Sequence, residues 1–112
     1  MHLAFHTKTL RELCESEHIA EKELGVKIST QLKNRISDLQ ASENVQQFKN
    51  LFLSKVTEIK IEDELYLIVD LTDDFILSFC ANHINNPILD DQLFWEKIQR
   101  IKIMRIGENN YE

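Results

Sequence analysis

The hydrophobic pattern of this chain changes its period once, near Leu51, and this change constrains the fold more than any other feature. Before it, apolar residues recur every three or four positions, most regularly in residues 28–39, as expected of a helix with one buried face. After it, apolar and polar residues alternate in stretches 57–61, 65–71 and 75–81, which is typical of strands. The sequence therefore predicts helices followed by a sheet.

Shorter signals define the two ends of the chain. Alternation in residues 2–6 predicts a first strand, and residues 10–24 fall near helical spacing up to Gly25, since glycine readily takes the left-handed conformation that ends a helix. Ser42 is expected to cap a third, short helix after the second. A last strand is expected over residues 98–104, following a long loop.

These expectations describe one α+β domain spanning residues 1–112. An N-terminal strand and a helical hairpin would pack on a mainly antiparallel sheet of about four strands. The leucine, phenylalanine and valine positions of the strands should face the helices. The opposite face would then carry Lys60, Tyr66, Asp70, Ile76, Ser78, Cys80, Arg100 and Lys102.

The charge of the chain is unevenly distributed. The net charge is −6, and residues 58–74 carry seven acids against one lysine, whereas residues 97–105 carry four cations and no acid. The basic segment is either a phosphate contact or a solvated strand face beside an acidic hairpin. There is no apolar run long enough to cross a membrane and no signal-peptide pattern. We therefore expect a cytoplasmic protein without membrane contact.

Three segments of the chain carry a family resemblance. They are the opening His2-Leu-Ala-Phe-His-Thr-Lys, the stretch from Leu24-Gly-Val-Lys to Asp38-Leu-Gln-Ala-Ser-Glu-Asn, and the closing Trp95-Glu-Lys-Ile-Gln-Arg-Ile-Lys-Ile-Met-Arg-Ile-Gly. Together they resemble the RelE/ParE superfamily, and within it the HigB-like killer toxins of type II toxin–antitoxin systems. The resemblance covers nearly the whole chain. It implies a RelE-like fold and a toxin that blocks translation as an endoribonuclease, by cleaving mRNA on the ribosome.

The resemblance also assigns catalytic roles on the sheet. A family lysine on the second strand matches Lys60, which would neutralise the scissile phosphate. The family arginine in the pattern aromatic-Arg-Leu-x-Phe falls on Ile76, and isoleucine cannot stabilise phosphorane charge. The C-terminal Tyr-His pair of the family matches Tyr111 and Glu112, so the tyrosine is present and the histidine is replaced.

Other groups could compensate for these departures. His83 follows the third of the alternating stretches and could replace the terminal histidine as acid or base, the alternative being a solvated loop histidine. Tyr111 could also stack on a base, the alternative being a frayed end. The cations expected to bind RNA or the ribosome are Arg100, Lys102 and Arg105.

A second hypothesis is a non-catalytic binding module of the same fold, either a ParE-like gyrase inhibitor or an antitoxin-binding relative. Ile68 and Ile76 on the outer sheet face would then suit a protein contact. Either hypothesis implies a cognate antitoxin, expected to be a HigA-like helix-turn-helix protein, and the first adds the ribosome and mRNA. The sequence has no phosphate-binding loop, dinucleotide fingerprint or zinc-ligand spacing, so we expect no cofactor and no metal.

Overall fold

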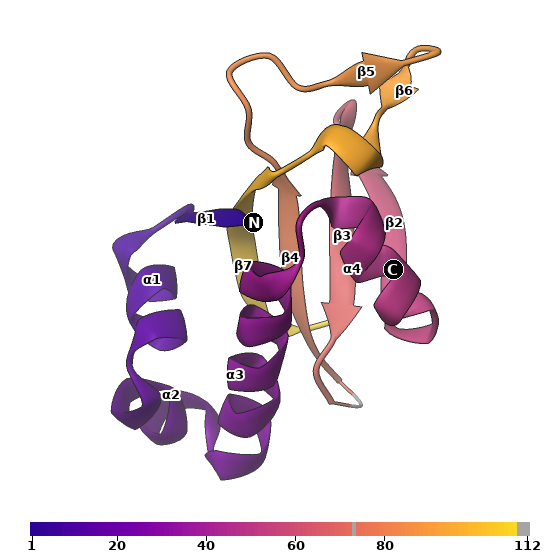
Figure 1. Ribbon diagram of the computed structural model, residues 1–112. Helices are drawn as coiled ribbons and strands as arrows, with labels where there is room; N and C mark the ends of the chain where they lie inside the picture. The colour runs from indigo at the N-terminus through magenta and orange to yellow at the C-terminus, as the bar shows by residue number, and fades with distance from the viewer. Residues whose placement is uncertain (73, 110–112) are drawn as a thin grey trace.

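The computed structural model describes residues 1–72 and 74–109 (Figure 1). Its helices are α1 (Lys8–Glu15), α2 (Glu17–Leu24), α3 (Val26–Ala41) and α4 (Val45–Leu51), with short 3-10 turns at Leu53–Lys55 and Trp95–Lys97. Its strands are β1 (His2–Phe5), β2 (Val56–Ile61), β3 (Glu64–Asp70), β4 (Phe75–Ala81), β5 (Ile88–Leu89), β6 (Gln92–Leu93) and β7 (Arg100–Glu108).

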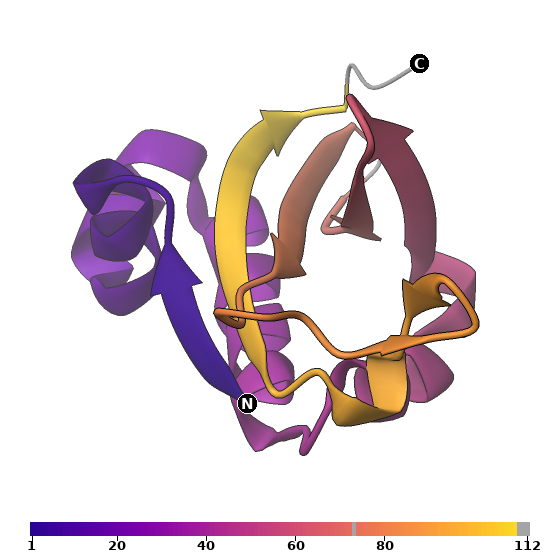
Figure 2. The same cartoon turned by 90° about the horizontal axis from the view of Figure 1, so that it is seen from above.

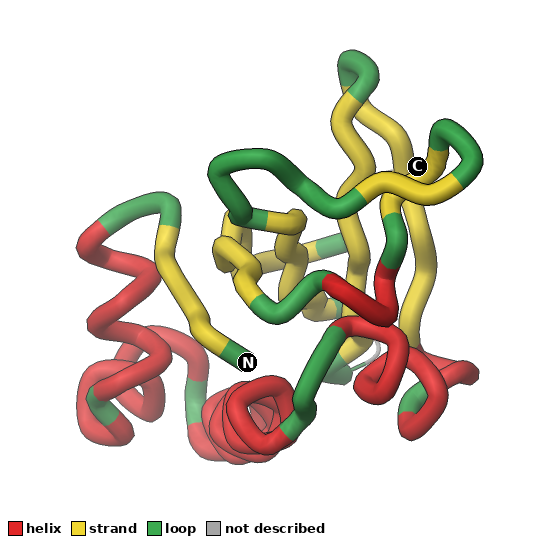
Figure 3. Tube along the Cα trace, turned by 45° about the horizontal axis from the view of Figure 1, so that its top comes forward, coloured by secondary structure: helices red, strands yellow, loops and turns green. Residues whose placement is uncertain are grey.

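Five strands form the main sheet, in the order β1-β7-β4-β3-β2. β1 runs parallel to β7, and the other neighbours are antiparallel. The expected α+β architecture is confirmed, but the sheet has five strands where about four were expected, because β1 pairs with β7 and extends the sheet at its edge. β5 and β6 form a separate small hairpin, which lies above the end of the sheet (Figures 1 and 3).

The first expected helix is divided at Ser16. The Ser16 backbone is extended, its N–H donates to the carbonyl of Glu12, and its hydroxyl accepts from the N–H of Ile19 at 3.2 Å. One residue thus ends α1 and caps α2, as serine does well because its side chain replaces a missing intrahelical partner. Gly25 ends α2 as expected, with a φ of 84°.

The cap of the third expected helix is Asn44, so the prediction of Ser42 was wrong. The Asn44 side-chain oxygen accepts from the N–H of Gln47 at 2.8 Å. Ser42 instead ends α3, and its hydroxyl donates to the carbonyl of Asp38 at 2.8 Å. Both residue types suit a helix end, and only the two extra residues of connection decide which of them caps α4.

Helices α3 and α4 cover one face of the sheet, and α1 and α2 lie beside α3 (Figure 1). The core between the layers contains side chains with almost no exposed surface: Leu32, Leu39, Val45, Phe48, Leu67, Val69, Leu77, Phe79, Ile98, Ile101 and Ile103. Its members from β3 and β4 are leucine, valine and phenylalanine positions expected to face the helices, and the rest come from α3, α4, β7 and the residue Ile98 before β7.

The opposite face of the sheet is less open than the alternation predicted. Ile68 is 5% exposed and Ile76 is 1% exposed, so the expected apolar contact surface made by these two residues was wrong. The sheet is curled rather than flat (Figure 2), and the Arg105 guanidinium lies beside Gly107, which is the register partner of Ile76. Curvature and this long side chain cover the isoleucines.

Candidate functional site

A β-bulge in β7 determines which cations share a face. Ile103 pairs with Phe79 but Arg105 pairs with Ser78, so Met104 is an extra residue in the strand. Simple alternation would put Arg105 on the helix-covered face with Ile103. The extra residue returns Arg105 to the opposite face, because a bulge shifts all later side chains by one position.

Arg100, Lys102 and Arg105 therefore project from one face of one strand, but they differ in their surroundings. Arg100 is exposed, and Lys102 is half-buried opposite Cys80. Arg105 donates from Nη2 to the carbonyl of Glu108, a bond that holds its guanidinium along the strand. Arg100 and Lys102 are thus the cations of this row that present their charge outward most readily.

The two cysteines are free thiols with raised pKa values. Burial raises the pKa of Cys14 to about 12, with a smaller contribution from Glu15. Burial also raises the pKa of Cys80 to about 11; the Glu64 carboxylate adds to this shift and Lys102 opposes it. Both thiols stay protonated at neutral pH, so neither is an activated nucleophile.

Lys60 lies on the other face of the sheet from Lys102. Lys60 pairs with Leu65, which shares its face with the core residue Leu67, whereas Lys102 pairs with Cys80 on the opposite face. Directly paired residues of neighbouring strands point to the same side. The expectation that Lys60 joins Arg100 and Lys102 on one face was therefore wrong, because Lys60 was assigned without knowing the register of β2.

His83 connects the end of β4 to the start of β7. Its Nε2 accepts from the backbone N–H of Gln99 at 3.0 Å and of Arg100 at 3.3 Å, and the backbone N–H of His83 donates to Oδ1 of Asn86 at 2.9 Å. Both bonds use the same ring nitrogen of His83 as their acceptor. In this geometry His83 holds a loop in place.

We expect His83→Ala to lower the free energy of unfolding by about 1 kcal/mol. The backbone N–H groups of Gln99 and Arg100 would lose the side chain that accepts their hydrogen bonds, and water would replace it only in part. His83→Gln keeps a side-chain acceptor and should recover part of the loss. Urea unfolding of the three proteins measures both values. Equal stability of His83→Ala and the wild-type chain would contradict this structural role.

Tyr111, the remaining catalytic candidate, lies outside the described residues, as does Glu112. Residues 1–72 and 74–109 therefore hold five of the six predicted site residues. Of these, Arg100, Lys102 and Arg105 share a face, whereas Lys60 lies on the opposite face and His83 lies in a loop.

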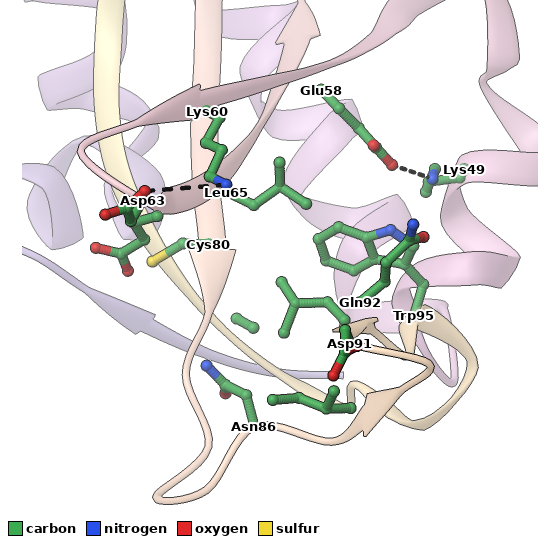
Figure 4. A pocket seen from close by; sticks show the side chains of 14 residues that line it. Lys49, Glu58, Lys60, Asp63, Leu65, Cys80, Asn86, Asp91, Gln92 and Trp95 are labelled. Atoms are coloured by element: carbon green, nitrogen blue, oxygen red, sulfur yellow. Dashed lines mark hydrogen bonds and ion pairs between the residues drawn. The ribbon is translucent and has the colours of Figure 1, made fainter.

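The sequence did not predict a cavity of about 680 Å³ between the β2–β3 hairpin, α4 and the β5–β6 hairpin (Figure 4). It is lined by Lys49, Glu58, Lys60, Asp63, Glu64, Leu65, Cys80, Ala81, Asn86, Ile88, Asp91, Gln92, Leu93 and Trp95. Trp95 is half-buried and forms part of the wall. One missed signal is Asp90-Asp91, whose φ values of 52° and 64° make the tight turn that aspartate tolerates better than most residues.

Two ion pairs hold the walls of this cavity. Lys49 Nζ lies 2.5 Å from Glu58 Oε1 and 5.3 Å from the centroid of the Trp95 ring, a cation–π contact that ties α4 to the second 3-10 turn. Lys60 Nζ lies 4.0 Å from Asp63 Oδ1 in a much more exposed pair. The first pair is therefore the firmer of the two.

Among residues 1–72 and 74–109, no helix combines the length and the apolar character needed to cross a membrane. In the same residues, no three His, Cys, Asp or Glu side chains gather as metal ligands would. Comparison of the chain with protein-family models, curated proteins and solved structures gives no match.

Proposed function

We propose that this protein is the toxin of a type II toxin–antitoxin pair, of RelE/ParE type, and that it blocks translation by cleaving mRNA on the ribosome. The observation that supports this best is the row of Arg100, Lys102 and Arg105 on one face of β7. Residues two apart in register on one face are separated by about 7 Å, which is comparable with the spacing of successive phosphates in single-stranded RNA. The local charge of this segment supports RNA binding although the whole chain is acidic.

The proposed reaction is an attack of a ribose 2′-oxygen on the adjacent phosphorus. The new bond forms between the 2′-oxygen and phosphorus, the bond from phosphorus to the 5′-oxygen breaks, and a proton moves from the 2′-hydroxyl to the departing oxygen through acid and base groups. Arg100 and Lys102 would stabilise the negative charge that gathers on the phosphoryl oxygens. Tyr111 is the acid–base group that the family resemblance assigns.

The direct test is primer extension on mRNA bound to purified ribosomes. Cuts inside the A-site codon are expected with the protein and not without it. Binding to RNA or ribosomes should also weaken as the salt concentration rises. In a plot of the logarithm of the binding constant against the logarithm of the salt concentration, each phosphate contact on a single strand contributes a slope of about −0.7. Lys102→Ala should make that slope shallower by about 0.7. A slope near zero for the wild-type chain would count against RNA binding.

A non-catalytic module of the same fold is the second candidate, and two observations favour it. Nε2 of His83 is engaged by backbone N–H groups, and Lys60 faces away from Lys102. In that case the protein binds an antitoxin, or a target such as gyrase, and catalyses no reaction. An absence of cuts at every protein concentration would favour it over the nuclease proposal.

A further inference from the structure

The cavity beside Trp95 is negatively charged. Two lysines line it, against four carboxylates from Glu58, Asp63, Glu64 and Asp91, which gives a net charge of −2. Lys49 and Lys60 pair with Glu58 and Asp63. The negative charges of Glu64 and Asp91, on two different hairpins, are not neutralised by these ion pairs, and Glu64 Oε2 accepts from the Tyr66 hydroxyl at 3.4 Å. A site of this kind repels phosphate and attracts a cation.

Trp95 gives the cavity an aromatic wall. In Figure 4, Lys49 lies beyond the indole ring, and Lys60 and Cys80 lie across the cavity from it. A cation beside an indole ring is stabilised by the negative face of the ring, and tryptophan is the most effective residue for this. Arginine uses such a wall better than lysine, because its planar guanidinium can stack on the ring while donating to carboxylates.

Exposed aliphatic residues follow β4 along the chain, and one of them, in β5, lines the cavity. Ile84, Ile88 and Leu89 are 102%, 66% and 53% exposed, and Ile88 also lines the cavity. Ile88 pairs with Leu93 in the hairpin, and both side chains line the cavity together with Leu65, which gives it an apolar side. An apolar side next to the charged one favours a peptide over a free amino acid or a small cation.

We propose that this cavity binds an arginine-bearing segment of a protein partner, with apolar residues on either side of the arginine. The guanidinium lies beside Trp95, Glu64 and Asp91 balance its charge, and the flanking side chains contact Leu65, Ile88 and Leu93. The proposal deepens the proposed function and rests on it for the identity of the partner, the antitoxin. The cavity is lined by none of the three cations of the β7 row, and its test needs no ribosome, so each proposal can fail without the other.

The probe is the peptide acetyl-Leu-Arg-Leu-amide. Trp95 is the only tryptophan of the chain, so its fluorescence reports on the cavity directly. A saturable change in Trp95 emission is expected with this peptide, and none with acetyl-Leu-Glu-Leu-amide at the same concentrations. Absence of saturation with the arginine peptide, or an equal response to both peptides, would overturn the proposal.

Asp91→Asn is the matching variant. Asparagine tolerates the positive φ of this position, so the turn is kept while the charge is removed. The dissociation constant of the arginine peptide should rise about two- to fivefold, as expected of an ion pair close to solvent. Glu23→Gln, an exposed charge change on α2, is the control and should leave binding unchanged. Unaltered binding by Asp91→Asn, or displacement of the peptide by a short oligouridine, would refute the assignment.

Discussion

Replacing Phe48 by alanine should lower the free energy of unfolding by about 3–5 kcal/mol, the usual cost of removing a buried aromatic ring. The Phe48 side chain has no exposed surface. Its ring centroid lies 5.0 Å from that of Phe52 and 6.2 Å, edge to face, from that of Phe79 in β4. Phe48 thus joins α4 to the middle of the sheet, and its loss leaves a cavity that the neighbours cannot fill.

Urea unfolding, followed by Trp95 fluorescence, measures this effect. A domain of this size typically has about 5–15 kcal/mol of stability in total, so the variant should unfold at a clearly lower urea concentration. Leu51→Ala, in the same helix but 67% exposed, is the matched control and should change stability by no more than about 0.5 kcal/mol. Similar losses in the two variants would show that α4 does not pack against the sheet through Phe48.

If the protein cleaves mRNA as proposed, Lys102→Ala should slow cleavage in the A site by about 10²–10³-fold, the range seen when one charge-stabilising donor is lost from a site. The reason is its place in the row on β7, on the same face as Arg100 and Arg105. Single-turnover cleavage on ribosomes programmed with one mRNA gives the rate. Thermal unfolding of the variant separates a loss of chemistry from a loss of fold.

Lys60→Ala provides the informative comparison, because Lys60 lies on the opposite face of the sheet. If RNA lies along the β7 row, Lys60→Ala should cleave at close to the wild-type rate, as should Lys22→Ala on the exposed side of α2. A large loss in Lys60→Ala with normal cleavage by Lys102→Ala would reverse this assignment. The RNA would then lie beside the cavity, with Lys60 in the role that the family resemblance gives it.

The parts of the fold that the sequence predicted are those governed by local period. The helix containing residues 28–39 and the three strands after Leu51 follow directly from the spacing of apolar residues, because each element buries one face. The division at Ser16 was missed, since helical spacing continues across it and only the cap geometry shows the break.

The candidate site was harder to predict because it depends on pairing between distant strands. Which face Lys60 occupies is determined by its partner Leu65, and burial of Ile76 depends on sheet curvature and on Arg105. The cavity is assembled from hairpins and a helix that are far apart in sequence, and no local pattern marks it. The charge distribution of the sequence indicated the basic strand, but it did not indicate that Lys60 lies on the opposite face of the sheet from that strand's cations.

The bulge at Met104 has a consequence for recognising relatives of this chain. A relative lacking that one residue would form a regular strand, yet its counterparts of Arg105, Ile106 and Gly107 would keep the sides they occupy here, since the bulge absorbs one position and leaves the pairing of later residues intact. A one-residue length difference elsewhere in β7 would instead exchange the buried and outward sets. In a sequence alignment, a one-residue gap at Met104 therefore leaves the buried and outward positions of β7 matched. A gap two residues away would match buried positions with outward ones.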